Sequence, residues 1–169
     1  MTRIAMIAAA ALGLGAPALA AEPAAKAMLK TADGADAGTV EIRTAGDGTL
    51  FRAELSGLTP GWHGFHVHET GSCEDGFQAA GDHYAPSGNS HGLMAEDGAH
   101  AGDLPNIFVH ENGEAKAEFY SARLSVTEGD APVMDEDGSA IVVHAQPDSY
   151  ASEAGAGDRV ACGVITQDN

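Results

Sequence analysis

Apolar and polar residues alternate in short runs after residue 23, and no run keeps the 3.6-residue period of a long amphipathic helix. Gly, Asp and Asn separate the runs, which is typical of β-strands that end in turns. The runs cover residues 24–31, 38–45, 49–56, 62–69, 106–111, 115–122, 140–145 and 159–166. This pattern predicts an all-β fold of eight short antiparallel strands, arranged as a sandwich or a barrel.

Two of the breaks between runs have the composition of hairpin turns. Gly46-Asp47-Gly48 separates the second run from the third, and Asn112-Gly113 separates the fifth from the sixth. Asn, Asp and Gly tolerate the positive φ angles that tight hairpin turns require. We therefore expect a β-hairpin at each of these two places.

Two long stretches do not fit the strand pattern. Residues 70–105 are rich in Gly, Asp and His, and residues 146–158 are rich in Gly, Ala and Ser. Loops longer than about 15 residues are uncommon in compact domains and are usually functional or disordered. Because the first loop carries three histidines, a bound metal could offset the entropy lost when it becomes ordered.

The first 20 residues, MTRIAMIAAAALGLGAPALA, are typical of a secretory signal peptide. One positive charge precedes an Ala/Leu-rich run that ends in small residues suited to cleavage. A membrane anchor is the weaker alternative, because the apolar run is short and contains Pro17. We expect residues 21–169 to form one exported domain.

Charge and cysteine content restrict the partners and the compartment. The formal net charge is −17, and loss of Arg3 with the signal peptide makes it one unit more negative. Such a surface repels nucleic acid and anionic lipid, so we expect neither nucleic acid nor a membrane as a partner. Cys73 and Cys162 are the only cysteines; in an exported chain they suggest a disulfide, with two free thiols as the alternative.

Histidines form the main candidate site. His66 and His68 alternate with Phe65 and Val67 along one run, so the two imidazoles should share a strand face while the apolar pair faces the core. Such a pair alone is a weak signal for metal binding. Further candidates are His83, His91, His100 and Asp103 in the first long loop, at spacings of eight, nine and three, and His144 at the end of an apolar run. Imidazole nitrogens and a carboxylate oxygen are ligands that tetrahedral zinc uses.

Five segments, GFHVHE, GDHYAP, HAGDLPN, VVHAQPD and RVACGVI, occur in this order and together resemble the copper/zinc superoxide dismutase family from about residue 38 to residue 165. The resemblance implies an eight-stranded Greek-key barrel or sandwich, related to immunoglobulin-like architectures, with two long functional loops. It also implies an oxidoreductase that converts the superoxide anion to dioxygen and hydrogen peroxide, with one copper and one zinc per subunit.

Residue roles carried over from the family fall on matching positions. The resemblance assigns copper to His66, His68, His83 and His144, and zinc to His83, His91, His100 and Asp103. His83 would therefore bridge the two metals and act in catalysis. The remaining implied roles are a Cys73–Cys162 disulfide, a carboxylate at Asp148 that hydrogen-bonds ligands of both metals, and a substrate-attracting catalytic guanidinium at Arg159.

Two histidines lie outside the implied ligand set, and the second long loop lacks a residue that is common in the family. We expect His63 to have a structural hydrogen-bonding role and His110 to be a solvated surface residue. Residues 146–158 contain no lysine, although family members commonly carry one there to attract the anion, and Glu153 occupies the region. We therefore expect weaker electrostatic steering than in lysine-bearing relatives.

The position of Cys73 resembles the bacterial periplasmic branch of the family, which with the signal peptide predicts a periplasmic or secreted protein. The insertion often seen in that branch is missing, so the resemblance allows a homodimer but leaves the interface open. Two other functions remain as alternatives: a non-catalytic secreted copper carrier of the same fold, and a zinc-stabilised binding module.

Overall fold

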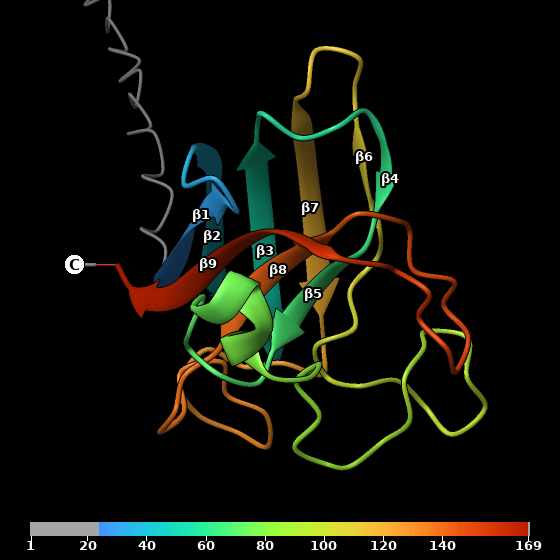
Figure 1. Ribbon diagram of the computed structural model, residues 1–169. Coiled ribbons are helices and arrows are strands. Elements are labelled where there is room, and N and C mark those ends of the chain that lie inside the picture. Colours follow the sequence, from blue (N-terminus) through green and yellow to red (C-terminus); the bar gives the residue numbers. More distant parts are fainter. Residues whose placement is uncertain (1–23, 169) are drawn as a thin grey trace, which may run out of the picture.

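Nine β-strands and one short 3-10 helix (η1) make up the part of the chain that the computed structural model describes, residues 24–168 (Figure 1). The expected signal peptide at residues 1–20 and its cleavage site lie outside the described residues. The elements are β1 Ala25–Thr31, β2 Asp36–Ala45, β3 Gly48–Leu55, β4 Gly61–His63, β5 Phe65–His68, η1 Asp75–Ala80, β6 Ile107–Val109, β7 Ala115–Ser121, β8 Ala140–His144 and β9 Arg159–Gln167. Among residues 24–168, no helix is long and apolar enough to cross a bilayer.

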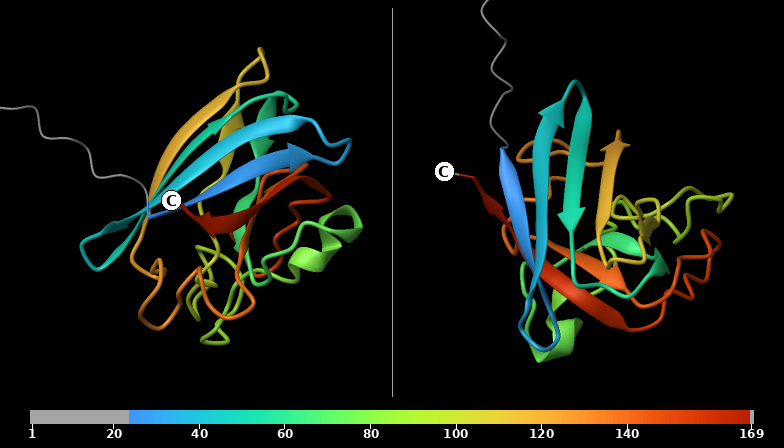
Figure 2. Two further views of the ribbon diagram at one scale, coloured as in Figure 1. Left: turned by 90° about the vertical axis from the view of Figure 1, so that its left-hand side faces the viewer. Right: turned by 90° about the horizontal axis from the view of Figure 1, so that it is seen from above.

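The strands form one large antiparallel sheet and a two-stranded ribbon. The large sheet has the order β5-β8-β9-β1-β2-β3-β7, and β4 pairs with β6. The large sheet is strongly curled, so that one of its faces lies on the inside of the curve, as the views in Figure 2 show. Neighbours such as β3 and β7 are far apart in sequence, as in a Greek key. The predicted all-β Greek-key barrel or sandwich is confirmed.

Each predicted run contains a strand, but the run at 62–69 divides into two. Gly64 separates β4 from β5, and the two halves pair with different partners, β6 and β8. A Cβ atom at Gly64 would lie 3.1 Å from the Ala156 side chain and 3.3 Å from the Cβ of His144. Glycine therefore lets the chain pass close to the second long loop while it changes sheet, which explains nine strands where eight were predicted.

The two predicted hairpins have different outcomes. β2 and β3 form the first, with Ala45 opposite Gly48 and Gly46 at a φ of 62°. The turn at Asn112-Gly113 also forms, and the His110 N–H donates to the Glu114 carbonyl. However, β6 pairs with β4 and β7 pairs with β3, so the second hairpin prediction is wrong. Turn composition specifies the reversal of the chain but not which strands then pair.

Strand β8 is apolar on both faces because both faces are covered. Ile141 and Val143 belong to the main core inside the curled sheet, whereas Ala140 and Val142 pack outward against Phe77 of η1. A disulfide between Cys73 and Cys162 links the segment before η1 to β9, across a sequence separation of 89 residues. The disulfide that the cysteine count suggested is therefore present, and η1, which the strand pattern did not predict, is held on the outer face of β8 and β9 (Figure 1).

Candidate metal centre

The pairing of β5 with β8 brings three histidines together at one end of the large sheet. His66 and His68 lie on β5 and His144 ends β8. The Nε2 atoms of His68 and His144 are 3.3 Å apart, and the ring centroids of His66 and His144 are 4.9 Å apart. Phe65 and Val67 point into the main core, so the predicted division of this strand into an imidazole face and an apolar face is confirmed.

His83 joins this group from the first long loop. It forms an isolated β-bridge with His68, and its ring centroid lies 4.0 Å from that of His66. Four imidazoles therefore converge, each with a nitrogen within 4.8 Å of the others: His66, His68, His83 and His144. We call them the four-histidine cluster.

A second cluster lies on the other side of His83. The Asp103 Oδ1 is 2.8 Å from the Nδ1 of His83 and 3.5 Å from the Nδ1 of His100. The Asp103 Oδ2 accepts hydrogen bonds from the backbone N–H groups of Gly92 and His100. Burial alone would raise the pKa of Asp103, but the hydrogen bond from His83 and the one from the Gly92 N–H hold it well below its usual value. We call His83, His100 and Asp103 the carboxylate cluster.

His91 lies between the carboxylate cluster and Asp148. Its Nε2 is 3.6 Å from the Asp103 Oδ1 and 2.9 Å from the Asp148 Oδ2, while its Nδ1 is 2.8 Å from the Ala151 carbonyl oxygen. The same Asp148 Oδ2 is 2.8 Å from the Nε2 of His66. The carboxylate of Asp148 therefore connects the two clusters.

Burial disfavours the charged form of His66, His68, His100 and His144, so these imidazoles are neutral at pH 7 and keep a ring nitrogen free to bind a cation. It lowers the pKa of His66 to about 4 and that of His144 to about 3, and it also lowers the pKa of His100. The Nδ1 atoms of His66 and His100 are buried without a hydrogen-bond partner. An unsatisfied buried polar atom costs about 1–3 kcal/mol, and a metal ion at each cluster would remove that cost. The donor sets fit two cations.

Arg159 lies next to the four-histidine cluster, at the start of β9. Its guanidinium donates to the carbonyl oxygens of Phe77 and Gly81, both at 2.6 Å. These carbonyls belong to η1 and the residue that follows it, which the Cys73–Cys162 disulfide attaches to the sheet. Although burial lowers the pKa of Arg159, a guanidinium remains charged. The segment around η1 thus holds a fixed cation beside the cluster.

The two remaining histidines behave as expected. His63 is buried, with its Nδ1 2.7 Å from the His144 carbonyl oxygen and its Nε2 2.8 Å from that of Thr59. These two contacts hold the backbone at His144 and Thr59 in place, and the predicted structural role of His63 is confirmed. His110 is exposed and lies against the ring of Phe108.

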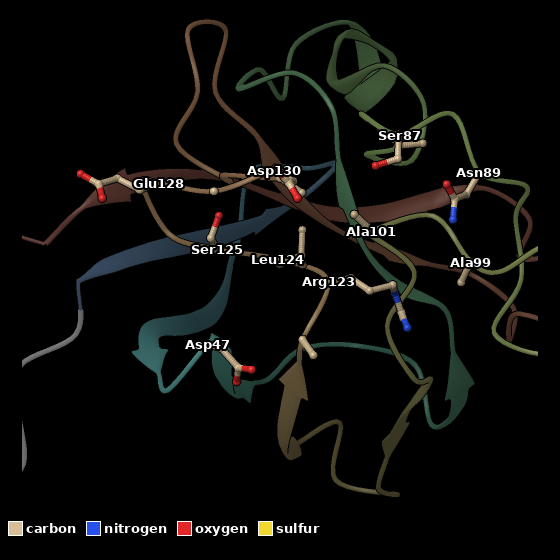
Figure 3. Close-up of a pocket in the computed structure, with 14 residues that line it drawn as sticks. Asp47, Ser87, Asn89, Ala99, Ala101, Arg123, Leu124, Ser125, Glu128 and Asp130 are labelled. Atoms are coloured by element: carbon tan, nitrogen blue, oxygen red, sulfur yellow. The ribbon is translucent and has the colours of Figure 1, made fainter.

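One residue that the sequence did not single out also contacts the carboxylate cluster. Arg123, far from the loops in sequence, donates to the Asp103 carbonyl oxygen. It also lines a surface hollow together with the carboxylates of Asp47, Glu128 and Asp130 (Figure 3). That hollow contains none of the clustered histidines and carries more negative than positive charge, so an anionic substrate has no reason to bind there.

The fold and the two clusters define a metal-binding β-sandwich protein with a cation placed to receive an anion. The family model described as copper/zinc superoxide dismutase (SODC) matches residues 36–165. The chain belongs to the copper/zinc superoxide dismutase family.

Individual relatives agree with this assignment. The protein from Caulobacter vibrioides named Superoxide dismutase [Cu-Zn] is 49% identical, over 83% of this chain and 84% of its own length. The protein of the same name from Photobacterium leiognathi is 40% identical, over 92% of each chain. Among solved structures, a SOD-like protein from Bacillus subtilis has a TM-score of 0.77 and 33% identity, covering 82% of this chain and 96% of its own.

The family resemblance noted in the sequence is thus confirmed, and with it the function. The chain is an oxidoreductase that dismutes superoxide, with copper and zinc as its cofactors. The curated relatives are named as enzymes, so a non-catalytic copper carrier and a zinc-stabilised binding module are not favoured.

Proposed function

We propose that the four-histidine cluster holds the copper, that the carboxylate cluster together with His91 holds the zinc, and that His83 is shared between the two metals. The observation that supports this assignment best is the position of His83. It belongs to both clusters, with its Nδ1 facing Asp103 and its ring against His66. No other described residue belongs to both the four-histidine and the carboxylate clusters.

His91 is the proposed ligand that the geometry supports least directly. Both of its ring nitrogens face oxygen atoms, those of Asp148 and Ala151. Its Nε2 is 3.6 Å from the Asp103 Oδ1 and 2.9 Å from the Asp148 Oδ2, so the ring lies within reach of the carboxylate cluster and would hold zinc together with it. This arrangement keeps the carboxylate of Asp148 between a proposed copper ligand and a proposed zinc ligand, where it orients both rings.

Bound copper would supply a one-electron couple, and bound zinc would supply a redox-inert positive charge. The chain itself attracts, orients and protonates the substrate. The guanidinium of Arg159 offers paired N–H donors to the small anion. His83 takes up one proton at Nε2 and delivers it, together with a second proton from solvent, as superoxide is reduced to hydrogen peroxide. Over one cycle, two superoxide anions and two protons yield one dioxygen and one hydrogen peroxide.

A His83→Ala variant tests the shared-ligand role. We expect weakened copper and zinc binding and loss of most of the activity, measured as metal content by mass spectrometry and as superoxide decay after pulse radiolysis. His110→Ala is the matched control, because it removes an exposed imidazole outside both clusters and should behave like the wild type. Near-wild-type turnover by His83→Ala with copper bound would overturn the proposal.

We also propose that the chain is exported to the periplasm after removal of residues 1–20. The disulfide supports an oxidising compartment. Cell fractionation after bacterial expression of the full chain, with N-terminal sequencing of the product, tests this proposal; an unprocessed cytoplasmic product would contradict it. The homodimer that the family resemblance allows stays a prediction, which sedimentation velocity of the purified protein can test.

A further inference from the structure

The backbone of Asp148 is held by a reciprocal pair of hydrogen bonds from one side chain. The Nδ2 of Asn106 donates to the Asp148 carbonyl oxygen at 2.9 Å, and the Asp148 N–H donates to the Oδ1 of Asn106 at 2.8 Å. The side-chain amide of Asn106 thus forms with the Asp148 backbone the same pair of hydrogen bonds that a residue on a neighbouring β-strand would form. It ties the second long loop to the segment just before β6 and leaves the carboxylate of Asp148 free for other contacts.

Tyr150 holds the carboxylate of Asp148 in turn. Its backbone N–H donates to the Asp148 Oδ1 at 2.6 Å, which leaves Oδ2 to face His66 and His91. The hydroxyl of Tyr150 accepts a hydrogen bond from the Asn106 N–H at 2.7 Å. Asn106, Asp148 and Tyr150 therefore form a closed cycle of hydrogen bonds.

The backbone of Tyr150 adopts an energetically unfavourable conformation. Its φ is 64°, in the left-handed region that disfavours residues with a Cβ atom. Residues in such conformations persist only where the surroundings impose them, and they concentrate at functional sites. Here the surroundings include a hydrogen bond from the Met94 N–H to the Tyr150 carbonyl oxygen, which joins the two long loops.

From this cycle we propose that Asn106 and Tyr150 are positioning residues that orient the carboxylate of Asp148 and thereby control zinc retention. The inference rests on the proposed ligand assignment. His66 is fixed independently by the pairing of β5 with β8, whereas His91 lies in a loop and depends on Asp148 and Ala151 for its orientation. Loss of the cycle should therefore weaken zinc binding more than copper binding.

Tyr150→Phe is the most selective test, because it removes one hydroxyl and leaves the Asn106 N–H without its acceptor. Tyr120→Phe is the matched control, since the Tyr120 hydroxyl donates to Asp47 at an exposed position outside both clusters. We expect zinc affinity, measured by chelator competition, to fall about three- to tenfold in Tyr150→Phe. This is less than the loss of about ten- to a hundredfold that follows removal of a direct partner of a metal ligand, because the hydroxyl acts on His91 through Asn106 and Asp148. Copper affinity and the control should change by less than about threefold.

A spectroscopic readout separates positioning from general stability. Cobalt(II) in place of zinc should show altered visible bands in Tyr150→Phe, while the melting temperature of the metal-free protein stays close to that of Tyr120→Phe. Asn106→Ala should weaken zinc binding at least as much as Tyr150→Phe. Asn106→Asp should recover part of the loss, because a carboxylate still accepts from the Asp148 N–H but cannot donate to its carbonyl oxygen.

Two outcomes would overturn the inference. One is a Tyr150→Phe protein with the zinc affinity and cobalt spectrum of the control. The other is an equal loss of zinc and copper affinity together with a lower melting temperature of the metal-free protein. His91→Ala separates this failure from failure of the ligand assignment: unchanged zinc affinity in that variant would refute the assignment itself, whereas a large loss there with none in Tyr150→Phe would refute only the role of the cycle.

Discussion

Replacing both Cys73 and Cys162 with serine removes the covalent link between β9 and the segment that precedes η1. The disulfide closes a loop with a sequence separation of 89 residues. In the chain-entropy model, a loop of this length stabilises the folded state by about 4.6 kcal/mol, and measured losses for native disulfides fall at about 2–5 kcal/mol. Because whole domains are stable by only about 5–15 kcal/mol, the double variant should fold but with a large part of its stability lost.

Urea unfolding of the metal-free protein, followed by circular dichroism, measures this loss without the added stability that bound metals confer. With a slope of about 1–3 kcal/mol per molar urea, we expect the midpoint to fall by at least about 1 M. The slope itself should rise, because the unfolded chain without the cross-link exposes more surface. Reductant provides the matched control: it should bring the wild type close to the double variant and leave the double variant unchanged.

The same substitution has a separate effect on the site. The carbonyls that hold Arg159 belong to Phe77 and Gly81, within the segment that the disulfide attaches to β9. The metal-loaded double variant should therefore have a lower kcat/KM for superoxide at normal copper content.

Two results would refute the loop-closure argument about stability. One is that the free energies of unfolding of the oxidised wild type and the double variant agree within about 1 kcal/mol. The other is a double variant that reductant still destabilises.

Three further predictions concern charge and protonation. Arg159→Ala should lower kcat/KM about tenfold or more with unchanged metal contents. Arg159→Lys should have a kcat/KM between those of the wild type and Arg159→Ala. An unchanged rate in Arg159→Ala would exclude a substrate-attracting role. Because residues 146–158 contain no lysine, the rate should fall only gently with added salt; Glu153→Lys should raise the low-salt rate and steepen that dependence, and a steep dependence in the wild type would contradict the prediction. The lowered pKa values of His66, to about 4, and His144, to about 3, mean that the unfolded chain, with histidines near 6.5, binds more protons below about pH 6.5. The free energy of unfolding of the metal-free protein should therefore decrease as the pH falls from about 6.5 to 4, by up to about 1.4 kcal/mol per pH unit for each histidine. Urea titrations at several pH values measure this slope, and a flat profile would contradict it.

Local patterns in the sequence were sufficient for the strands and for both turns. The alternation of apolar and polar residues located a strand in every predicted run, because side chains of a strand alternate between two faces whatever the strand later pairs with. For the same reason His66 and His68 could be assigned to one face and Phe65 and Val67 to the other. The turn at Gly46-Asp47-Gly48 followed from backbone preferences of the residues themselves.

Pairing between distant segments could not be derived from such patterns. The division of 62–69 at Gly64 depends on the second long loop passing over that glycine. The failure of β6 and β7 to form a hairpin depends on β4 and β3 as competing partners. The family resemblance indicated which histidines to group, but it carried no information about the orientation of any ring.

By itself, the sequence determined where strands form, which residues share a strand face, and which family the chain resembles. The resemblance also implied that His83 is shared and that Asp148 contacts ligands of both metals. Only the tertiary structure decided how the His83 and His91 rings are oriented, and that Asn106 and Tyr150 hold the Asp148 carboxylate. The physical reason is that strand periodicity is a property of neighbouring residues, whereas a hydrogen bond across 42 positions of the chain exists only after the loops and sheets have packed.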